Sequence, residues 1–175
     1  MRRFAFVLAL LGGSGCKIVF GSGDLLLYNG TDQSAEVTVD GRTSGTFTIP
    51  AHRGERLEGA VAGAYKVVEK APTQRQDQFE LKDGGTVVVN IGSEACFARS
   101  DISGMYTTGK EPVRLLQTYD KLDVLAFDVA IPVLPGEPPP ARRPKSAYAF
   151  QRLSEVPCNL MRDEAAMADW VRKTR

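Results

Sequence analysis

Residues 34–42 of the 175-residue chain read SAEVTVDGR, and this stretch is the first indication that the protein is built from β-strands. Its alanine and two valines alternate with polar residues, which is typical of a β-strand with one buried face. The pair Asp40-Gly41 is a strong hairpin signal, and TFTI at 46–49 supplies a return strand that Pro50 ends. This part of the sequence therefore predicts an antiparallel hairpin.

Further strands are expected on both sides of this hairpin. DLLLYNGTDQ at 24–33 is an apolar run closed by turn residues, and AGAYKVVEKA at 62–71 again alternates. DQFELKDGGTVVVNIG at 77–92 predicts the clearest hairpin in the chain, with its turn at residues 83–85. Several short strands at this spacing, separated by Gly, Asp and Asn turns, predict a mainly β protein built as an antiparallel β-sandwich.

The second half of the chain is less regular. The segment 132–144 is rich in proline, which lacks the amide donor of a central strand, so a loop is expected there. Asn159 can cap a short C-terminal α-helix over 159–173. The folded domain is predicted to span 24–175. Further strands are predicted at 96–102, 113–119, 124–131 and 146–153.

The N-terminus has the layout of a secretory signal peptide over residues 1–15. Arg2 and Arg3 form a positive region, residues 4–11 are apolar, and small residues lead to Cys16. The apolar run is too short to span a bilayer, which needs roughly 20 residues.

GSGC, which ends at Cys16, resembles the lipobox of bacterial lipoproteins, in which a peptidase cuts before a lipid-modified cysteine. It differs from the usual pattern in having Gly13 three positions before the cysteine, where leucine is common. The resemblance implies acylation of Cys16, attachment of the protein to a membrane of the bacterial cell envelope, and a flexible tether over 16–23. Lys17, in place of aspartate, favours the periplasmic face of the outer membrane. The alternative is a secreted protein cut nearby with Cys16 unmodified.

The other two cysteines form an even pair once Cys16 is assigned to lipid. Export places Cys96 and Cys158 in an oxidising compartment, which predicts a disulfide between them. The alternative is a pair of buried free thiols.

The net charge is close to zero. The chain has 22 Lys and Arg against 21 Asp and Glu, and removal of residues 1–15 deletes Arg2 and Arg3, leaving 20 against 21. This balance argues against a nucleic-acid partner, for which a strongly basic face is expected.

Candidate catalytic and metal-binding residues are few. The one histidine, His52, lies in a polar stretch expected to be an exposed loop, and neither a G-x-S-x-G motif nor a zinc-ligand cluster is present. No cofactor or metal is therefore predicted. Asp120, Asp123 and Asp128 could serve hydrolysis or hold Ca²⁺ if they converged. Strand alternation instead sends Asp123 to the face opposite the other two.

YNGTDQSAEVTVDGR at 28–42, followed by LEGAVAGAYKV at 57–67, resembles the small immunoglobulin-like or carrier-like β domains of bacterial envelope lipoproteins. The resemblance implies a fold class and no site. We therefore expect a non-enzymatic lipoprotein, a binding or scaffolding module with a protein partner in the envelope. The alternative hypothesis is a periplasmic hydrolase that uses carboxylates such as Asp120 and Asp123.

Overall fold

The structure is a computed structural model, which describes residues 21–106, 114–142 and 150–173. Within this part of the chain no helix is long and apolar enough to cross a membrane. The predicted signal peptide and Cys16 lie outside the described residues. The strands are β1 (Ser22–Asn29), β2 (Ala35–Gly41), β3 (Gly45–Ile49), β4 (Arg53–Val61), β5 (Gly63–Ala71), β6 (Arg75–Leu81), β7 (Thr86–Ile91), β8 (Cys96–Asp101), β9 (Arg114–Tyr119), β10 (Val124–Phe127) and β11 (Gln151–Val156). The helical segments are the short 3-10 turns η1 (Ser103–Tyr106) and η2 (Cys158–Leu160), and the helix α1 (Glu164–Lys173).

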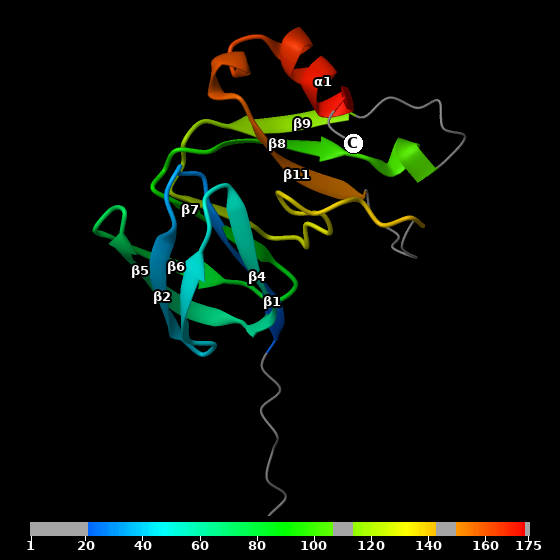
Figure 1. The fold of residues 1–175 in the computed structure, drawn as a ribbon. Coiled ribbons are helices and arrows are strands. Elements are labelled where there is room, and N and C mark those ends of the chain that lie inside the picture. The colour runs from blue at the N-terminus through cyan, green and yellow to red at the C-terminus, as the bar shows by residue number, and fades with distance from the viewer. Residues whose placement is uncertain (1–20, 107–113, 143–149, 174–175) are drawn as a thin grey trace, which may run out of the picture.

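The strands form three sheets. Sheet A has the order β10-β7-β1-β4, sheet B the order β3-β2-β5-β6, and sheet C the order β11-β8-β9. Sheet B packs on one face of sheet A and sheet C on the other, and α1 covers the outer face of sheet C (Figure 1). The predicted mainly β fold, with sandwich-like packing of antiparallel sheets and a short C-terminal helix, is confirmed. One pairing departs from it, because β1 and β7 run parallel.

The central strands of sheet A explain this layering. Leu25 and Leu27 of β1 point into the core shared with sheet B, whereas Leu26 and Tyr28 point into the core shared with sheet C. All six residues of the neighbouring strand β7 are buried. A strand buried on both faces is expected to be a continuous apolar run, as LLLY and TVVV are. These two runs therefore require a layer on each side of sheet A.

The hairpin predicted at residues 83–85 is wrong. β6 pairs with β5 in sheet B, whereas β7 pairs with β1 and β10 in sheet A, so the turn carries the chain from one sheet to the other. β6 alternates between half-buried and exposed residues, as an edge strand does, whereas β7 needs a central position. Gly84, with φ +67°, supplies the left-handed conformation of this turn.

Two residues of the predicted tether over 16–23 belong to a strand. β1 begins at Ser22, and Ser22 and Gly23 pair with Val61 and Ala60 of β4. A Cβ atom at Gly23 would lie 2.6 Å from the carbonyl oxygen of Gly85. The glycine therefore serves a close approach of two backbone segments rather than flexibility.

Two other local expectations also change. β2 and β3 do form the predicted hairpin, but Asp40-Gly41 belongs to β2, and residues 42–44 make the turn. β4 was not expected, because its sequence RGERLEGAV is mostly polar. It is an edge strand that pairs only with β1 in sheet A, so one side of it faces solvent.

The C-terminal helix begins later than the predicted Asn159. α1 starts at Glu164, after the turn η2, and Oδ1 of Asp163 accepts a hydrogen bond from the amide of Ala166 at 2.9 Å, which caps the helix. Met167 anchors α1 on sheet C. The described part of the proline-rich loop, 132–142, contains no strand, and its one ladder contact is a bridge from Val133 to β11.

Candidate functional site

Two adjoining cavities meet at the end of β11, the first extending to the proline-rich loop and the second to the turns at 30–33, 72–73 and 92–95. Their volumes are about 630 and 520 Å³, and they share His52, Glu155, Val156 and Pro157 as walls. We call the combined space the β11 groove. The first cavity is also lined by Tyr28, Glu137, Arg152, Ser154 and Trp170, and the second by Asp32, Thr73, Gly92, Glu94 and Cys158, among others.

His52 stands where the two cavities meet. Its Nε2 lies 2.9 Å from Oδ1 of Asp32, in the loop after β1, and its Nδ1 lies 3.9 Å from Oε1 of Glu155 on β11. The ring is 52% exposed, and the backbone adopts φ +52° in the turn before β4. The predicted exposed loop histidine is thus half exposed and held between carboxylates from two other segments.

Glu155 also accepts a short hydrogen bond from the hydroxyl of Tyr28. Burial raises the pKa of Tyr28, and the hydrogen bond and negative charge of Glu155 raise it further, against a smaller opposing effect of Arg53. The phenol therefore stays neutral as a donor, and the contact ties β11 to the centre of sheet A. The Tyr28 ring is fixed in turn by an edge-to-face contact with Phe97, with centroids 5.6 Å apart.

The proline-rich loop forms the wall opposite β11. Nη1 of Arg56 on β4 lies 3.0 Å from Oε2 of Glu137, and Nη2 lies 2.6 Å from Oδ2 of Asp24. The same Glu137 oxygen accepts the amide of Leu134 at 2.9 Å. Burial lowers the pKa of Arg56, but the hydrogen bonds and charges of Asp24 and Glu137 outweigh it, so the pKa is raised overall. The ion pair between Arg56 and Glu137 thus holds the proline-rich loop against β4.

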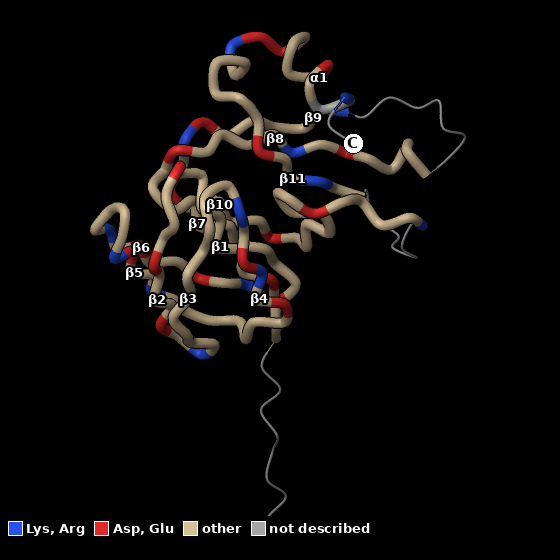
Figure 2. The backbone as a smooth tube through the Cα atoms, viewed as in Figure 1, with Lys and Arg blue, Asp and Glu red and all other residues tan. Residues whose placement is uncertain are grey.

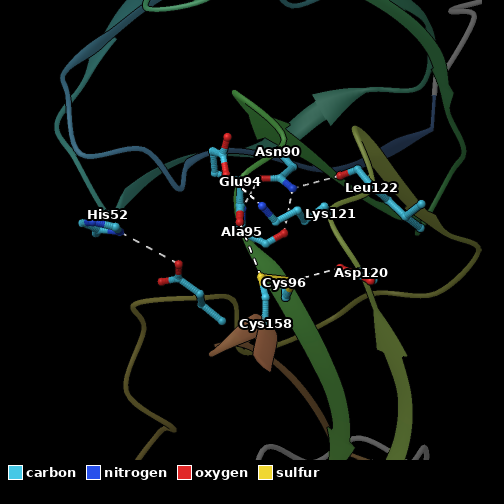
Figure 3. The surroundings of a disulfide bond; sticks show 10 residues. His52, Asn90, Glu94, Ala95, Cys96, Asp120, Lys121, Leu122 and Cys158 are labelled. Atoms are coloured by element: carbon cyan, nitrogen blue, oxygen red, sulfur yellow. Dashed lines mark hydrogen bonds and ion pairs between the residues drawn. A yellow bond between two sulfur atoms is a disulfide. The ribbon is translucent and has the colours of Figure 1, made fainter. Parts of the chain in front are cut away.

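The disulfide forms another wall. The structure joins Cys96 of β8 to Cys158, the pair predicted from the sequence (Figure 3). Cys158 also lines the second cavity. Oδ1 of Asp120 lies 3.3 Å from Sγ of Cys96. Cys96, Cys158 and Asp120 are close enough together to resemble a metal site. Because the two sulfur atoms are bonded to each other, they offer no thiolates to a metal ion.

A buried ion pair supports the far wall of the second cavity. The side chain of Glu69 is fully buried, and its carboxylate lies 2.7 Å from Nη2 of Arg75 and accepts the amide of Gly92 at 3.1 Å. Thr73, in the same cavity wall, donates to Glu69 as well. Nη1 of Arg75 reaches Oδ1 of Asp123 at 2.7 Å. This network connects the β5–β6 turn to the β7–β8 turn.

The three acids singled out from the sequence have separate surroundings. Asp123 pairs with Arg75, Asp128 pairs with Lys82 at 2.9 Å, and Asp120 faces the disulfide. None of the three lines either cavity of the β11 groove. The structure therefore does not bring them together.

Polar and charged side chains line both cavities of the β11 groove and can form hydrogen bonds with a ligand. Across the described ranges, no serine, threonine or cysteine is hydrogen-bonded to His52, whose partners are carboxylates. Charges of both signs are interspersed along the described backbone (Figure 2). This arrangement is suited to holding a ligand between β11 and the loops.

Several groove residues were not identified from the sequence, among them Tyr28, Asp32, Ser154, Glu155 and Trp170. They come from distant segments, and Tyr28 and Glu155 are 127 residues apart. Comparison with known proteins finds no family model, no curated protein and no solved structure that matches this chain.

Proposed function

We propose that this protein is a non-enzymatic lipoprotein of the bacterial cell envelope whose folded body binds a partner protein in the β11 groove. The observation that carries the proposal is the groove itself, about 630 and 520 Å³ in its two parts, walled by elements that ion pairs and a disulfide hold in place. A largely preformed cleft is the ordinary setting of a binding site.

The membrane attachment is proposed from the leader. Arg2, Arg3, the apolar run and GSGC ending at Cys16 support cleavage and acylation at Cys16. Acyl chains contribute about 0.8 kcal/mol for each buried CH₂ group, so more than one chain gives a stable anchor. Lys17 supports the periplasmic face of the outer membrane as the location.

The hydrolase hypothesis based on Asp120 and Asp123 has less support. Glycoside hydrolysis requires two carboxylates on opposite sides of one substrate bond. Asp123 is engaged by Arg75, and Asp120 faces the disulfide. No observation on the described residues favours a substrate between them.

Site-specific photo-crosslinking in the native host tests the binding proposal. A photoreactive residue at exposed Pro138, in the first cavity, or at exposed Asp32, in the second, should capture the same partner protein. The matched control is exposed Glu80 on β6, the edge strand of sheet B, which lines neither cavity. Capture of one protein from both groove positions and not from Glu80 supports the proposal. Equal capture from Glu80, or none from the groove, contradicts it.

A further inference from the structure

β11 is an edge strand whose outer side is only partly paired. The amide of Leu153 donates outward to the carbonyl of Val133 at 2.9 Å, in a parallel bridge between the proline-rich loop and Arg152. In a parallel ladder the next donor would be residue 135. Because Pro135 has no amide hydrogen, the ladder stops there.

Strand alternation shows which groups are left over. The N–H and C=O of one residue in a strand point to the same side, and successive residues point to opposite sides. Since the Leu153 amide points outward, the carbonyl of Leu153 and both backbone groups of Glu155 also point outward, while Ser154 is directed toward Ala98 of β8. Among the described residues, none of these three outward groups has a hydrogen-bond partner.

The first cavity lies along this stretch of β11. Ser154 lines it, is only 4% exposed, and has no hydrogen-bond partner for its hydroxyl within the described chain. A buried polar group without a partner costs about 1–3 kcal/mol. The free backbone groups and this hydroxyl are therefore the places where a ligand would add hydrogen bonds.

The charges lining the groove favour a basic ligand. Of the residues that the structure describes, four acids line the two cavities, Asp32, Glu94, Glu137 and Glu155, against one arginine, Arg152. Glu137 is paired with Arg56 and Glu94 with the exposed Lys121, whereas Asp32 and Glu155 flank His52. Among the described residues, the second cavity is lined by Asp32, Glu94 and Glu155 and by no lysine or arginine.

We propose that an extended segment of a partner protein adds to the outer edge of β11 as a new strand, pairing with Leu153 and Glu155 and placing a lysine or arginine in the second cavity. Main-chain hydrogen bonds supply affinity in this mode, and side-chain pockets supply specificity. The inference rests on the proposed function, since it specifies how the β11 groove holds its partner. The proline-rich loop beside this edge limits which chains can pair with it.

The test uses the full chain in detergent and peptides selected on it from a random dodecapeptide library displayed on phage. Glu155→Pro removes the outward amide and leaves the β8–β11 hydrogen bonds in place, because the Glu155 backbone points away from β8. Glu155→Ala is the matched control, since it loses the same carboxylate and keeps the amide. Selected peptides should contain lysine or arginine and bind Glu155→Pro at least about fivefold more weakly than Glu155→Ala, as one lost hydrogen bond implies.

Two further measurements do not depend on the folding of a variant. N-methylation of alternate peptide amides should weaken binding to the unaltered protein, and the Glu155 amide should exchange its hydrogen more slowly when peptide is bound.

Equal affinity of the peptides for the two Glu155 variants, with NMR shifts still at His52 and Trp170, contradicts strand addition but leaves the proposed binding in the groove intact. Peptides that shift only residues outside the groove overturn the proposed function as well. If the unaltered chain forms a concentration-dependent dimer and Glu155→Pro abolishes it, the proposed partner protein is wrong. The strand that pairs with β11 then belongs to a second copy of this chain.

Discussion

Reduction of the Cys96–Cys158 disulfide should destabilise the domain strongly. The bond closes a loop of 62 residues, for which the chain-entropy relation predicts a loss of about 4 kcal/mol when the bond is opened. Native domains are stable by only about 5–15 kcal/mol, so this loss is a large share of the total. At a denaturant slope of about 2 kcal/mol/M, the urea midpoint should fall by about 2 M.

The C-terminal helix α1 should be the first part of the domain to detach when the disulfide is opened. Cys158 begins η2, which leads into α1, and the helix otherwise rests on sheet C through a small cluster around Met167. Trp170 of α1 lines the β11 groove. Opening the bond should therefore weaken ligand binding in the groove at urea concentrations too low to unfold the sheets.

Urea titrations of the full chain with and without a phosphine reductant measure the effect without removing either sulfur atom. The control is Cys96→Ala combined with Cys158→Ala, whose midpoint should be low and insensitive to reductant. A midpoint that reductant moves by less than about 0.3 M would refute the entropic reasoning. Two alkylatable thiols at these positions in protein from the native host would refute the disulfide itself.

Three other predictions concern the anchor, the groove and the acids. Cys16→Ser should move the protein from the membrane fraction to the soluble fraction, and unchanged fractionation or an unmodified intact mass would contradict acylation. Because the pKa of folded Tyr28 is raised above the unfolded value of about 10, its contribution to stability is present below that pH and is lost as the pH rises above it. Tyr28→Phe should therefore flatten the fall in urea midpoint at alkaline pH, and an unchanged slope would contradict this linkage. Asp120→Asn and Asp123→Asn should each cost less than about 1 kcal/mol and leave cellular function nearly intact, since Asp123 is an exposed member of its ion pair. Loss of function in either variant with normal circular dichroism would favour the hydrolase hypothesis.

The fold class could be predicted from the sequence because alternation is a local property. Val37 and Val39 of β2, and Tyr65 and Val67 of β5, face the core as period two requires. Strand partners are not a local property. The turn at residues 83–85 reads as a hairpin, yet its two strands go to different sheets, because a run buried on both faces needs neighbours on each side and the turn carries no information about them.

The candidate site was harder to predict, because none of its residues is unusual in its own segment. Asp32 follows an Asn-Gly turn, His52 lies in a polar stretch, and Glu137 sits among prolines. The packing of sheet A on sheet C and the position of the proline-rich loop bring these residues to β11. The contacts involved join residues far apart in the sequence, 81 residues for Arg56 and Glu137 and 127 for Tyr28 and Glu155.

One local signal does distinguish β11 in retrospect. Its sequence, QRLSEV, places buried Ser154 beside Glu155, so polar groups occur on both faces where a strand of a sandwich would have an apolar face. Such a pattern is unfavourable in a central strand, since each buried polar group needs a partner. It is tolerated where the strand borders a cavity, because solvent or another chain can reach the polar side chains there. The sequence predicts this strand only as far as Leu153, and the polar residues that follow it, Ser154 and Glu155, are the ones that line the β11 groove.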